Sequence, residues 1–275
     1  MKFDFVFSGR LVFLLIIWTV LTAMIGFRGT YTDFVKLKHV PGFDTKPAIS
    51  LPIKPDFSKI NDVNRKKKEF FEYLSPYIEE ANKEVLQVRS NLLRISKAAN
   101  NGKLSGKDSI YIKTIASTYR SPKYIVNEKD LIDDLLKRVD VIPVSLALAQ
   151  AANETAWGTS RFAIKGNNYF GIWCFSKGCG IVPHKRGGGE THEVAKFASP
   201  AESAVYYIKQ LNSHNNYQLL RELRAQARVS GEPMISGADL AGGLESYSAI
   251  GMQYVASIRS IIRVNKLNKF DFAIQ

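Results

Sequence analysis

The chain has 275 residues, of which 45% are hydrophobic and 23% are charged. This composition excludes a disordered polyelectrolyte and a small scaffold that depends on disulfides, and the length suits one main domain with an accessory region. The net charge of +13 favours a polyanionic partner such as nucleic acid, a phospholipid surface or an anionic cell-envelope polymer, and charge alone does not choose among them.

The N-terminal segment is typical of a membrane-directed sequence. Lys2 and Arg10 precede an uncharged apolar run over residues 11–27. A helix over this run is about 26 Å long, close to the ~30 Å thickness of a hydrocarbon core. The sequence therefore predicts a signal anchor over residues 1–29, with a cleaved signal peptide as the alternative. Both interpretations imply that the rest of the chain is exported.

A proline-containing linker and a helical accessory region are predicted next. Residues 30–57 contain four prolines and few large apolar side chains, as expected of an extended spacer. From residue 58 to about residue 99 apolar side chains recur every three or four residues, and Pro76 either bends this helix or begins a second one. With a further helix over about 105–119, these elements form a predicted accessory region over 58–125.

The remaining residues, 126–275, are predicted to form a mainly helical α+β domain. A helical pattern ends at Arg138, and a new helix over 144–156 begins with Pro143 in its first turn. A stretch rich in glycine and aromatic residues follows at 158–180. A β-like segment lies at 194–197, and further helices are predicted over about 200–213, 236–245 and 251–265.

Glu154 is the residue in this pattern that points to chemistry. Helical spacing places it on one face with Ala147, Gln150 and Ala151, so most of its neighbours are small and apolar. Burial raises the pKa of a carboxyl group and keeps it protonated near neutral pH, as a general acid requires. The alternative is an ordinary salt bridge or solvent contact at a helix end. Gly158 can end the helix and leave Glu154 at the edge of a cleft.

The residues around Glu154 also carry a family resemblance. The string E-T-A-W-G-T-S-R-F-A, followed by K-G-N-N-Y-F-G-I-W-C-F, resembles the signature of glycoside hydrolase family 73, the bacterial glucosaminidases. The resemblance covers about residues 135–265. It implies a lysozyme-like α+β domain that cleaves the β-1,4 bond after N-acetylglucosamine in peptidoglycan, with Glu154 as the catalytic acid.

The resemblance also indicates supporting residues. Family members carry an important tyrosine near the end of the domain, which implies Tyr247 as a catalytic residue beside the reacting sugar and Tyr254 as the second tyrosine. The T-x-E-Y pattern that supplies a second carboxylate in many members is absent here, and Glu190 or Glu193 could serve instead. A substrate acetamido group could replace this carboxylate, or a single acid could suffice.

The substrate-binding residues are expected among amide and aromatic side chains near the signature, because these groups suit N-acetyl sugars. The candidates are Gln150, Trp157, Asn168, Tyr169 and Tyr254.

The two cysteines, Cys174 and Cys179, are predicted to form a disulfide, because an exported chain meets an oxidising compartment. The alternative is a structural zinc site completed by His184 and His192. The C-x4-C spacing and export favour the disulfide, so we expect neither a metal nor a cofactor.

Together these features predict a peptidoglycan hydrolase of the cell envelope. We expect inner-membrane anchoring with the catalytic domain in the periplasm, or secretion if the signal is cleaved. The expected partners are peptidoglycan glycan strands and, through the N-terminal segment, the cytoplasmic membrane. Nucleic acid is not expected, because no DNA- or RNA-binding motif accompanies the basic charge. The alternatives are a lytic transglycosylase, an endo-β-N-acetylglucosaminidase acting on glycoproteins, and a non-catalytic wall-binding scaffold.

Overall fold

The computed structural model describes residues 53–271 except 185, 188 and 233. The expected anchor over residues 1–29 and most of the expected linker over 30–57 therefore lie outside the described residues. Among the helices of the described part, none has both the length and the apolar composition that a membrane crossing requires.

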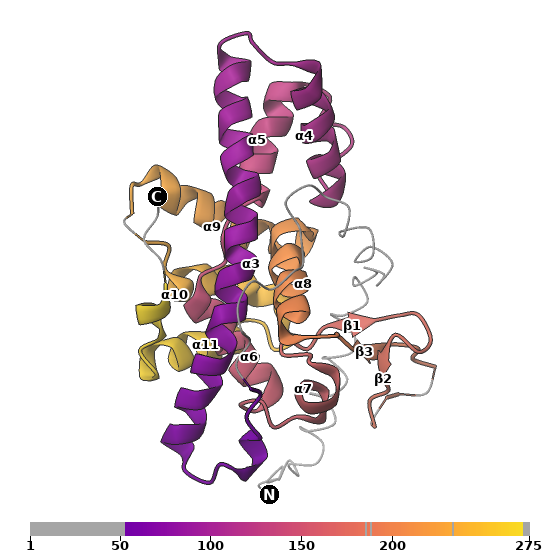
Figure 1. The fold of residues 1–275 in the computed structure, drawn as a ribbon, viewed down its shortest axis with the longest axis vertical. Coiled ribbons are helices and arrows are strands. Elements are labelled where there is room, and N and C mark those ends of the chain that lie inside the picture. Colours follow the sequence, from indigo (N-terminus) through magenta and orange to yellow (C-terminus); the bar gives the residue numbers. More distant parts are fainter. Residues whose placement is uncertain (1–52, 185, 188, 233, 272–275) are drawn as a thin grey trace, which may run out of the picture.

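A single long helix, α3 (Val63–Asn100), runs through the molecule from one end to the other (Figure 1). The Asp62 side chain caps its start by accepting a hydrogen bond from the backbone N–H of Arg65. Pro76 lies inside this helix and does not end it. Large apolar side chains before and after the proline, such as Phe70 and Ile78, are buried, and this packing holds the helix together across the lost hydrogen bond.

Two shorter helices extend α3 into an arm, at the top of Figure 1. Helix α4 (Gly106–Thr118) begins with a capping box, and helix α5 (Glu128–Arg138) packs against both α3 and α4. A short 3-10 turn, η2 (Phe57–Lys59), precedes α3.

Helix α6 (Val144–Thr155) lies at the centre of the remaining part and packs against α3, α10 and α11. Most of its residues are buried. Pro143 begins the helix without a side-chain cap of its own. Instead Asp271, far along the chain, accepts hydrogen bonds from the backbone N–H of Ser145 at 2.8 Å and from its hydroxyl at 2.6 Å. The first turn of α6 is thus stabilised by the last described residue.

A small antiparallel sheet follows helix α7 (Arg161–Gly166), with strand order β1-β3-β2. The strands are β1 (Trp173–Cys174), β2 (Gly180–Ile181) and β3 (Glu193–Ala195). Cys174 pairs with Glu193, and Ile181 pairs with Val194. The sheet projects to one side of the helices (Figure 1), and together with them it gives the mainly helical α+β architecture expected from the sequence.

The last elements are helices, of which α10, α11 and η5 pack on α6 and α8 packs on α3. Helix α9 was not among the elements predicted from the sequence, and the predicted helix over 236–245 is a short α-helix followed by a 3-10 helix. At this point a Cβ on Gly243 would lie 2.3 Å from Leu220 Cα, so the chain passes very close to α9. The elements are α8 (Pro200–Ser213), η3 (Asn215–Tyr217), α9 (Gln218–Val229), α10 (Gly237–Leu240), η4 (Ala241–Tyr247), α11 (Met252–Val264) and η5 (Leu267–Phe270).

A buried charge cluster ties α3 and α9 to the segment that leads into α6. Asp140 accepts hydrogen bonds from Arg228 Nε at 2.5 Å and Nη2 at 2.6 Å, and Arg89 lies 3.4 Å away. Arg224 is 0% exposed and donates to the backbone carbonyl of Asp140 and to other carbonyls nearby. Burial by itself raises the pKa of Asp140, but the arginines outweigh it and hold that pKa below its usual value.

The predicted accessory region and the predicted catalytic domain share one hydrophobic core. Helix α3 packs on α6 and α8 as well as on α5, and the buried apolar residues form one cluster that reaches from Phe57 to Leu267. The boundary between the two predicted regions therefore crosses a continuous core, and α3 helps to position α6.

Candidate active site

Glu154 lies in the last turn of α6, at the point where the helix stops. Thr155 is the last residue of the helix. The three residues after it, Ala156, Trp157 and Gly158, all have positive φ angles, of 47°, 61° and 77°. Gly158 is required here because a Cβ would lie 2.5 Å from the ring of Phe57. The backbone N–H groups of Ala156 and Trp157 both bond to the carbonyl of Ala152. This sharp stop leaves Glu154 partly exposed at the end of a mostly buried helix.

The two carboxyl oxygens of Glu154 have different surroundings. Oε1 accepts a hydrogen bond from the Tyr254 hydroxyl at 3.0 Å and another from Asn153 Nδ2 at 3.3 Å. Oε2 makes no hydrogen bond to any residue within the described part of the chain. It lies beside Gly171, where a Cβ would come within 3.0 Å of it. One oxygen is therefore held by the protein and the other is left for a ligand.

The protonation of Glu154 follows from this environment. Burial raises the pKa of its carboxyl group above the usual value, and the hydrogen bonds from Tyr254 and Asn153 only partly oppose that rise. The proton is therefore retained at a higher pH than on an exposed glutamate. Such a group can act as a general acid near neutral pH.

The sequence favours Tyr247 as the catalytic partner, but Tyr254 is the tyrosine that contacts Glu154. The Tyr247 hydroxyl donates to the backbone carbonyl of Phe170 at 2.7 Å. The two tyrosine rings stack, with centroids 5.4 Å apart and planes at 12°. Tyr247 thus holds both Tyr254 and the loop that carries Gly171.

Gln150 lies one helical turn before Glu154 and is fully buried. Its Nε2 donates to the Tyr254 hydroxyl at 2.9 Å, and its Oε1 accepts from the Tyr207 hydroxyl at 2.6 Å. Both of these hydrogen bonds go to protein groups behind Glu154. The structure therefore places Gln150 in the support of the acid and not, as the sequence suggested, in contact with a sugar.

Asn168 is likewise buried and turned toward the backbone, although the sequence predicts a sugar-binding role. Its Nδ2 donates to the carbonyls of Ile172 and Ala195 at 2.8 and 2.9 Å. Its Oδ1 accepts from the N–H groups of Phe170 and Ile172 at 3.3 and 3.0 Å. With its donors and acceptor in use, this amide shapes the loop around Gly171.

Trp157 and Tyr169 pack against α3. The Trp157 ring meets Phe70 and Phe71 edge to face at 6.0 and 5.4 Å. Tyr169 is 0% exposed, and its ring lies 6.3 Å from that of Phe70 and 6.2 Å from that of Tyr73. Tyr169 therefore belongs to the core instead of the predicted groove, whereas Trp157 stays partly exposed.

The two candidates for a second carboxylate differ in their environment. Glu193 is buried in β3, and its two oxygens accept hydrogen bonds from the N–H groups of Gly178 and Gly180 at 2.9 and 2.8 Å. These bonds lower the pKa of Glu193. Glu190 is partly exposed, accepts from the N–H of Gly187 at 3.1 Å and lies 3.6 Å from His192. Of the two, Glu190 is the more accessible to a ligand.

Cys174 and Cys179 form a disulfide, as the sequence predicts. The zinc alternative is wrong, because the two sulfurs are bonded to each other and cannot serve as thiolate ligands. His192 does not turn toward them either: its ring stacks on Trp173 with centroids 3.8 Å apart. The disulfide and Glu193 together close the loop between β1 and β2.

Three residues at Glu154 were not predicted as site residues: Asn153, Gly171 and Tyr207. Gly171 stands inside the quoted signature and Asn153 directly precedes it, so their position in the sequence was a usable signal. Tyr207 comes from α8, about fifty residues away, and no sequence pattern connects it with Gln150.

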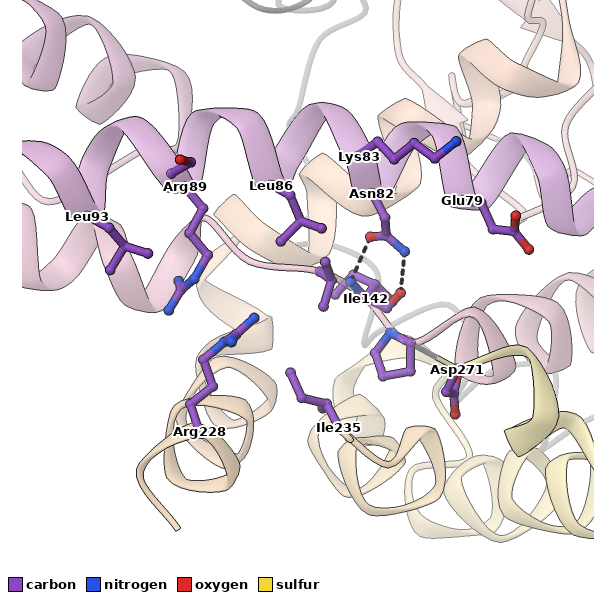
Figure 2. A pocket seen from close by; sticks show the side chains of 13 residues that line it. Glu79, Asn82, Lys83, Leu86, Arg89, Leu93, Ile142, Arg228, Ile235 and Asp271 are labelled. Atoms are coloured by element: carbon purple, nitrogen blue, oxygen red, sulfur yellow. Dashed lines mark hydrogen bonds between the residues drawn. The ribbon is translucent and has the colours of Figure 1, made fainter. Parts of the chain in front are cut away.

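A separate cavity of about 750 Å³ lies along α3 and at the opposite end of α6 (Figure 2). Glu79 and Asp271 line one end of it, and Arg89 and Arg228 line the other. Asn82 bridges to the backbone of Ile142 by two hydrogen bonds, of 2.7 and 2.9 Å. Glu154 is not among its lining residues, so this cavity is distinct from the candidate active site.

Comparisons with known proteins give the same family as the resemblance carried by the residues around Glu154. The family described as "Glucosaminidase: Mannosyl-glycoprotein endo-beta-N-acetylglucosaminidase" matches residues 129–267. Protein bax of Escherichia coli (strain K12) is 34% identical over 201 residues, which cover 73% of this chain and 70% of that protein. No solved structure matches the chain significantly. The matched region contains α6 and the residues that surround its end, and the chain belongs to the glucosaminidase family.

Proposed function

We propose that this protein is a peptidoglycan hydrolase that cleaves the β-1,4 bond after N-acetylglucosamine, with Glu154 as the general acid. The observation that carries the proposal is the asymmetric carboxyl group at the end of α6. Tyr254 holds Oε1, while Oε2 has no partner within the described residues and lies beside a residue without a side chain. Membership of a glycosidase family supports the same role.

In the proposed reaction, Glu154 Oε2 gives its proton to the glycosidic oxygen as the bond from that oxygen to the anomeric carbon breaks. The sugar oxygen leaves as a hydroxyl group, and Glu154 becomes a carboxylate that Tyr254 stabilises by its hydrogen bond. Water then adds its oxygen to the anomeric carbon and gives up a proton to the second carboxylate. Glu190 is the proposed second carboxylate, because Glu193 is occupied by the backbone of the disulfide loop.

The proposed substrate is the glycan strand of peptidoglycan, and the proposed location is the cell envelope. The net charge of +13 suits an anionic wall polymer or membrane surface. The apolar segment within residues 1–29 would anchor the chain in the inner membrane with the catalytic part in the periplasm, or direct its secretion if it is cleaved.

Digestion of purified sacculi by the full-length protein tests this function. New N-acetylglucosamine reducing ends are expected, and Glu154→Gln should lower the rate by about 10²–10⁴-fold because general acid catalysis contributes that much. Glu72→Gln, an exposed change on α3, is the control and should keep the parent rate. An unchanged rate for Glu154→Gln contradicts the assignment of the acid.

The products separate the alternative functions. Anhydro-muramyl ends indicate a lytic transglycosylase, and reducing N-acetylmuramic acid indicates a muramidase. Release of glycan from a glycoprotein with an N-linked chitobiose core indicates an endoglycosidase of glycoproteins. Binding to sacculi without release of soluble fragments indicates a scaffold.

A further inference from the structure

A chain of four buried or partly buried side chains leads to Glu154 from behind. Tyr207 on α8 is linked to Gln150 on α6 by a hydrogen bond of 2.6 Å. Gln150 is linked to Tyr254 on α11 at 2.9 Å, and Tyr254 is linked to Glu154 Oε1 at 3.0 Å. Three helices therefore contribute to one continuous line of hydrogen bonds.

We propose that Gln150 and Tyr207 are positioning residues that fix the direction of this line, so that the proton for the leaving sugar is carried by Glu154 Oε2. The inference rests on the proposed role of Glu154 as proton donor. Neither residue touches the substrate, and both act through Tyr254.

The direction follows from the two unlike ends of an amide. Gln150 Oε1 can only accept, so the Tyr207 hydroxyl donates to it. Gln150 Nε2 can only donate, so the oxygen of Tyr254 accepts. The hydroxyl hydrogen of Tyr254 then points to Glu154 Oε1. A proton on Oε1 would point at the hydroxyl hydrogen of Tyr254, so the proton of the neutral carboxyl group lies on Oε2.

A reversed amide would have the opposite effect. Tyr254 would donate to Gln150 Oε1 and could then only accept from Glu154, so the proton would sit on Oε1, directed into the protein. Tyr207 opposes this reversal. Its hydroxyl makes its hydrogen bond to Gln150 Oε1 and is enclosed in the core, so reversal would leave a buried O–H without an acceptor.

Packing keeps Tyr207 in place for this task. Its ring stacks on Phe170, with centroids 4.1 Å apart and planes at 11°, and the residue is 0% exposed. Phenylalanine can keep this stacking while it removes only the hydroxyl. Tyr207→Phe is therefore a narrow test of the hydrogen bond.

The test measures the alkaline limb of the kcat/KM profile with sacculi and full-length protein, because a general acid loses activity as pH rises through its pKa. Tyr254 donates to the ionised carboxylate and so lowers the pKa of Glu154. Tyr254→Phe should move the limb upward by about one pH unit. Tyr207→Phe should move it upward by about half a unit, and should lower kcat/KM by about 3–10-fold at pH values below the limb.

Three further variants complete the design. The double variant of Tyr207 and Tyr254 should shift the limb no further than Tyr254→Phe alone, since the line is already broken. Tyr217→Phe is the matched control: this buried tyrosine bonds to Gln210 and lies outside the line, so the limb should stay in place. Gln150→Met should behave as Tyr207→Phe does, and if it fails to fold the tyrosine variants decide.

The inference would be overturned if folded Tyr207→Phe keeps the alkaline limb of kcat/KM at the parent pH. It would also be overturned if the shifts of the two single variants add up in the double variant. Titration of ¹³C-labelled glutamate carboxyl groups by NMR gives the pKa of Glu154 without turnover, with Glu154→Gln used to assign the signal. If Glu154→Gln keeps its hydrolytic activity, the proposed function fails. If that variant is inactive but Tyr207→Phe leaves the titration unmoved, only the positioning role fails.

Discussion

Gly171 offers a direct way to crowd Oε2 of Glu154, the oxygen that we propose to carry the transferred proton. It has a φ angle of +64°, and a Cβ there would lie 3.0 Å from Oε2. Gly102, in the turn after α3, has a φ angle of +63° with nothing within 4 Å of its added Cβ. Alanine at these two positions therefore imposes the same backbone strain, but only at Gly171 does the new methyl group meet the acid.

The expected magnitudes separate strain from contact. Each alanine should lower the free energy of unfolding by about 1–2 kcal/mol, because left-handed backbone is unfavourable for a residue with a Cβ. Gly171→Ala should also lower kcat/KM by about 10–100-fold, since a small displacement of a catalytic group is costly and the methyl group occupies one approach to Oε2. Gly102→Ala should keep the parent activity.

The assay pairs release of soluble fragments from dye-labelled sacculi with urea unfolding of each variant. The rates are compared at a temperature where both variants are folded. If Gly171→Ala is as active as Gly102→Ala, then Oε2 is not the oxygen that faces the substrate, and the proposed geometry of proton transfer is refuted.

Two further substitutions address the surroundings of the site. Asp140→Asn should lower the free energy of unfolding by about 3–5 kcal/mol, because it leaves the charges of Arg224 and Arg228 buried without their partner. The control in urea unfolding is Glu80→Gln, which breaks only an exposed pair with a lysine and should cost less than about 1 kcal/mol. Equal losses of stability in the two variants would contradict the importance of the buried cluster. Glu193→Gln should lower the free energy of unfolding by about 1–2 kcal/mol, because its hydrogen bonds to the disulfide loop become weaker. The folded variant should still digest sacculi. Loss of digestion by a folded variant would identify Glu193 as the second carboxylate.

The sequence predicted that Glu154 lies near the end of a helix, and local chemistry explains why. Pro143 begins α6, the run of small residues buries it, and Gly158 ends it, so Glu154 had to lie near a helix end. The disulfide was predictable for the same reason, since its two cysteines are only five positions apart.

The sequence could not assign the partners of the acid, because these depend on contacts between distant helices. Which tyrosine reaches Glu154 depends on how α11 packs on α6 and on η4. Tyr254 lies on α11 and contacts Glu154, whereas Tyr247 ends η4 and bonds to the carbonyl of Phe170. The roles of Asn168 also depend on which backbone groups surround it, and spacing does not reveal them.

Helix α9 shows a different limit. Its buried face includes Arg221 and Arg224, and a pattern-based interpretation assigns arginines to the solvent side. Arg221 is stable there because it donates to the backbone carbonyls of Leu211 and His214. Arg224 donates to the carbonyl of Asp140, 84 residues earlier in the chain, and lies 4.0 Å from its carboxylate.

The contact between Asp271 and Ser145 orders events during synthesis of the chain. A ribosome adds the capping carboxylate of α6 only 126 residues after the serine that it caps. The nascent polypeptide therefore carries the acid on a helix whose first turn still lacks its stabilising anion. Synthesis as far as Asp271 is the step that completes the capping of this helix, so a product that stops before Asp271 would hold Glu154 on a helix with an uncapped first turn.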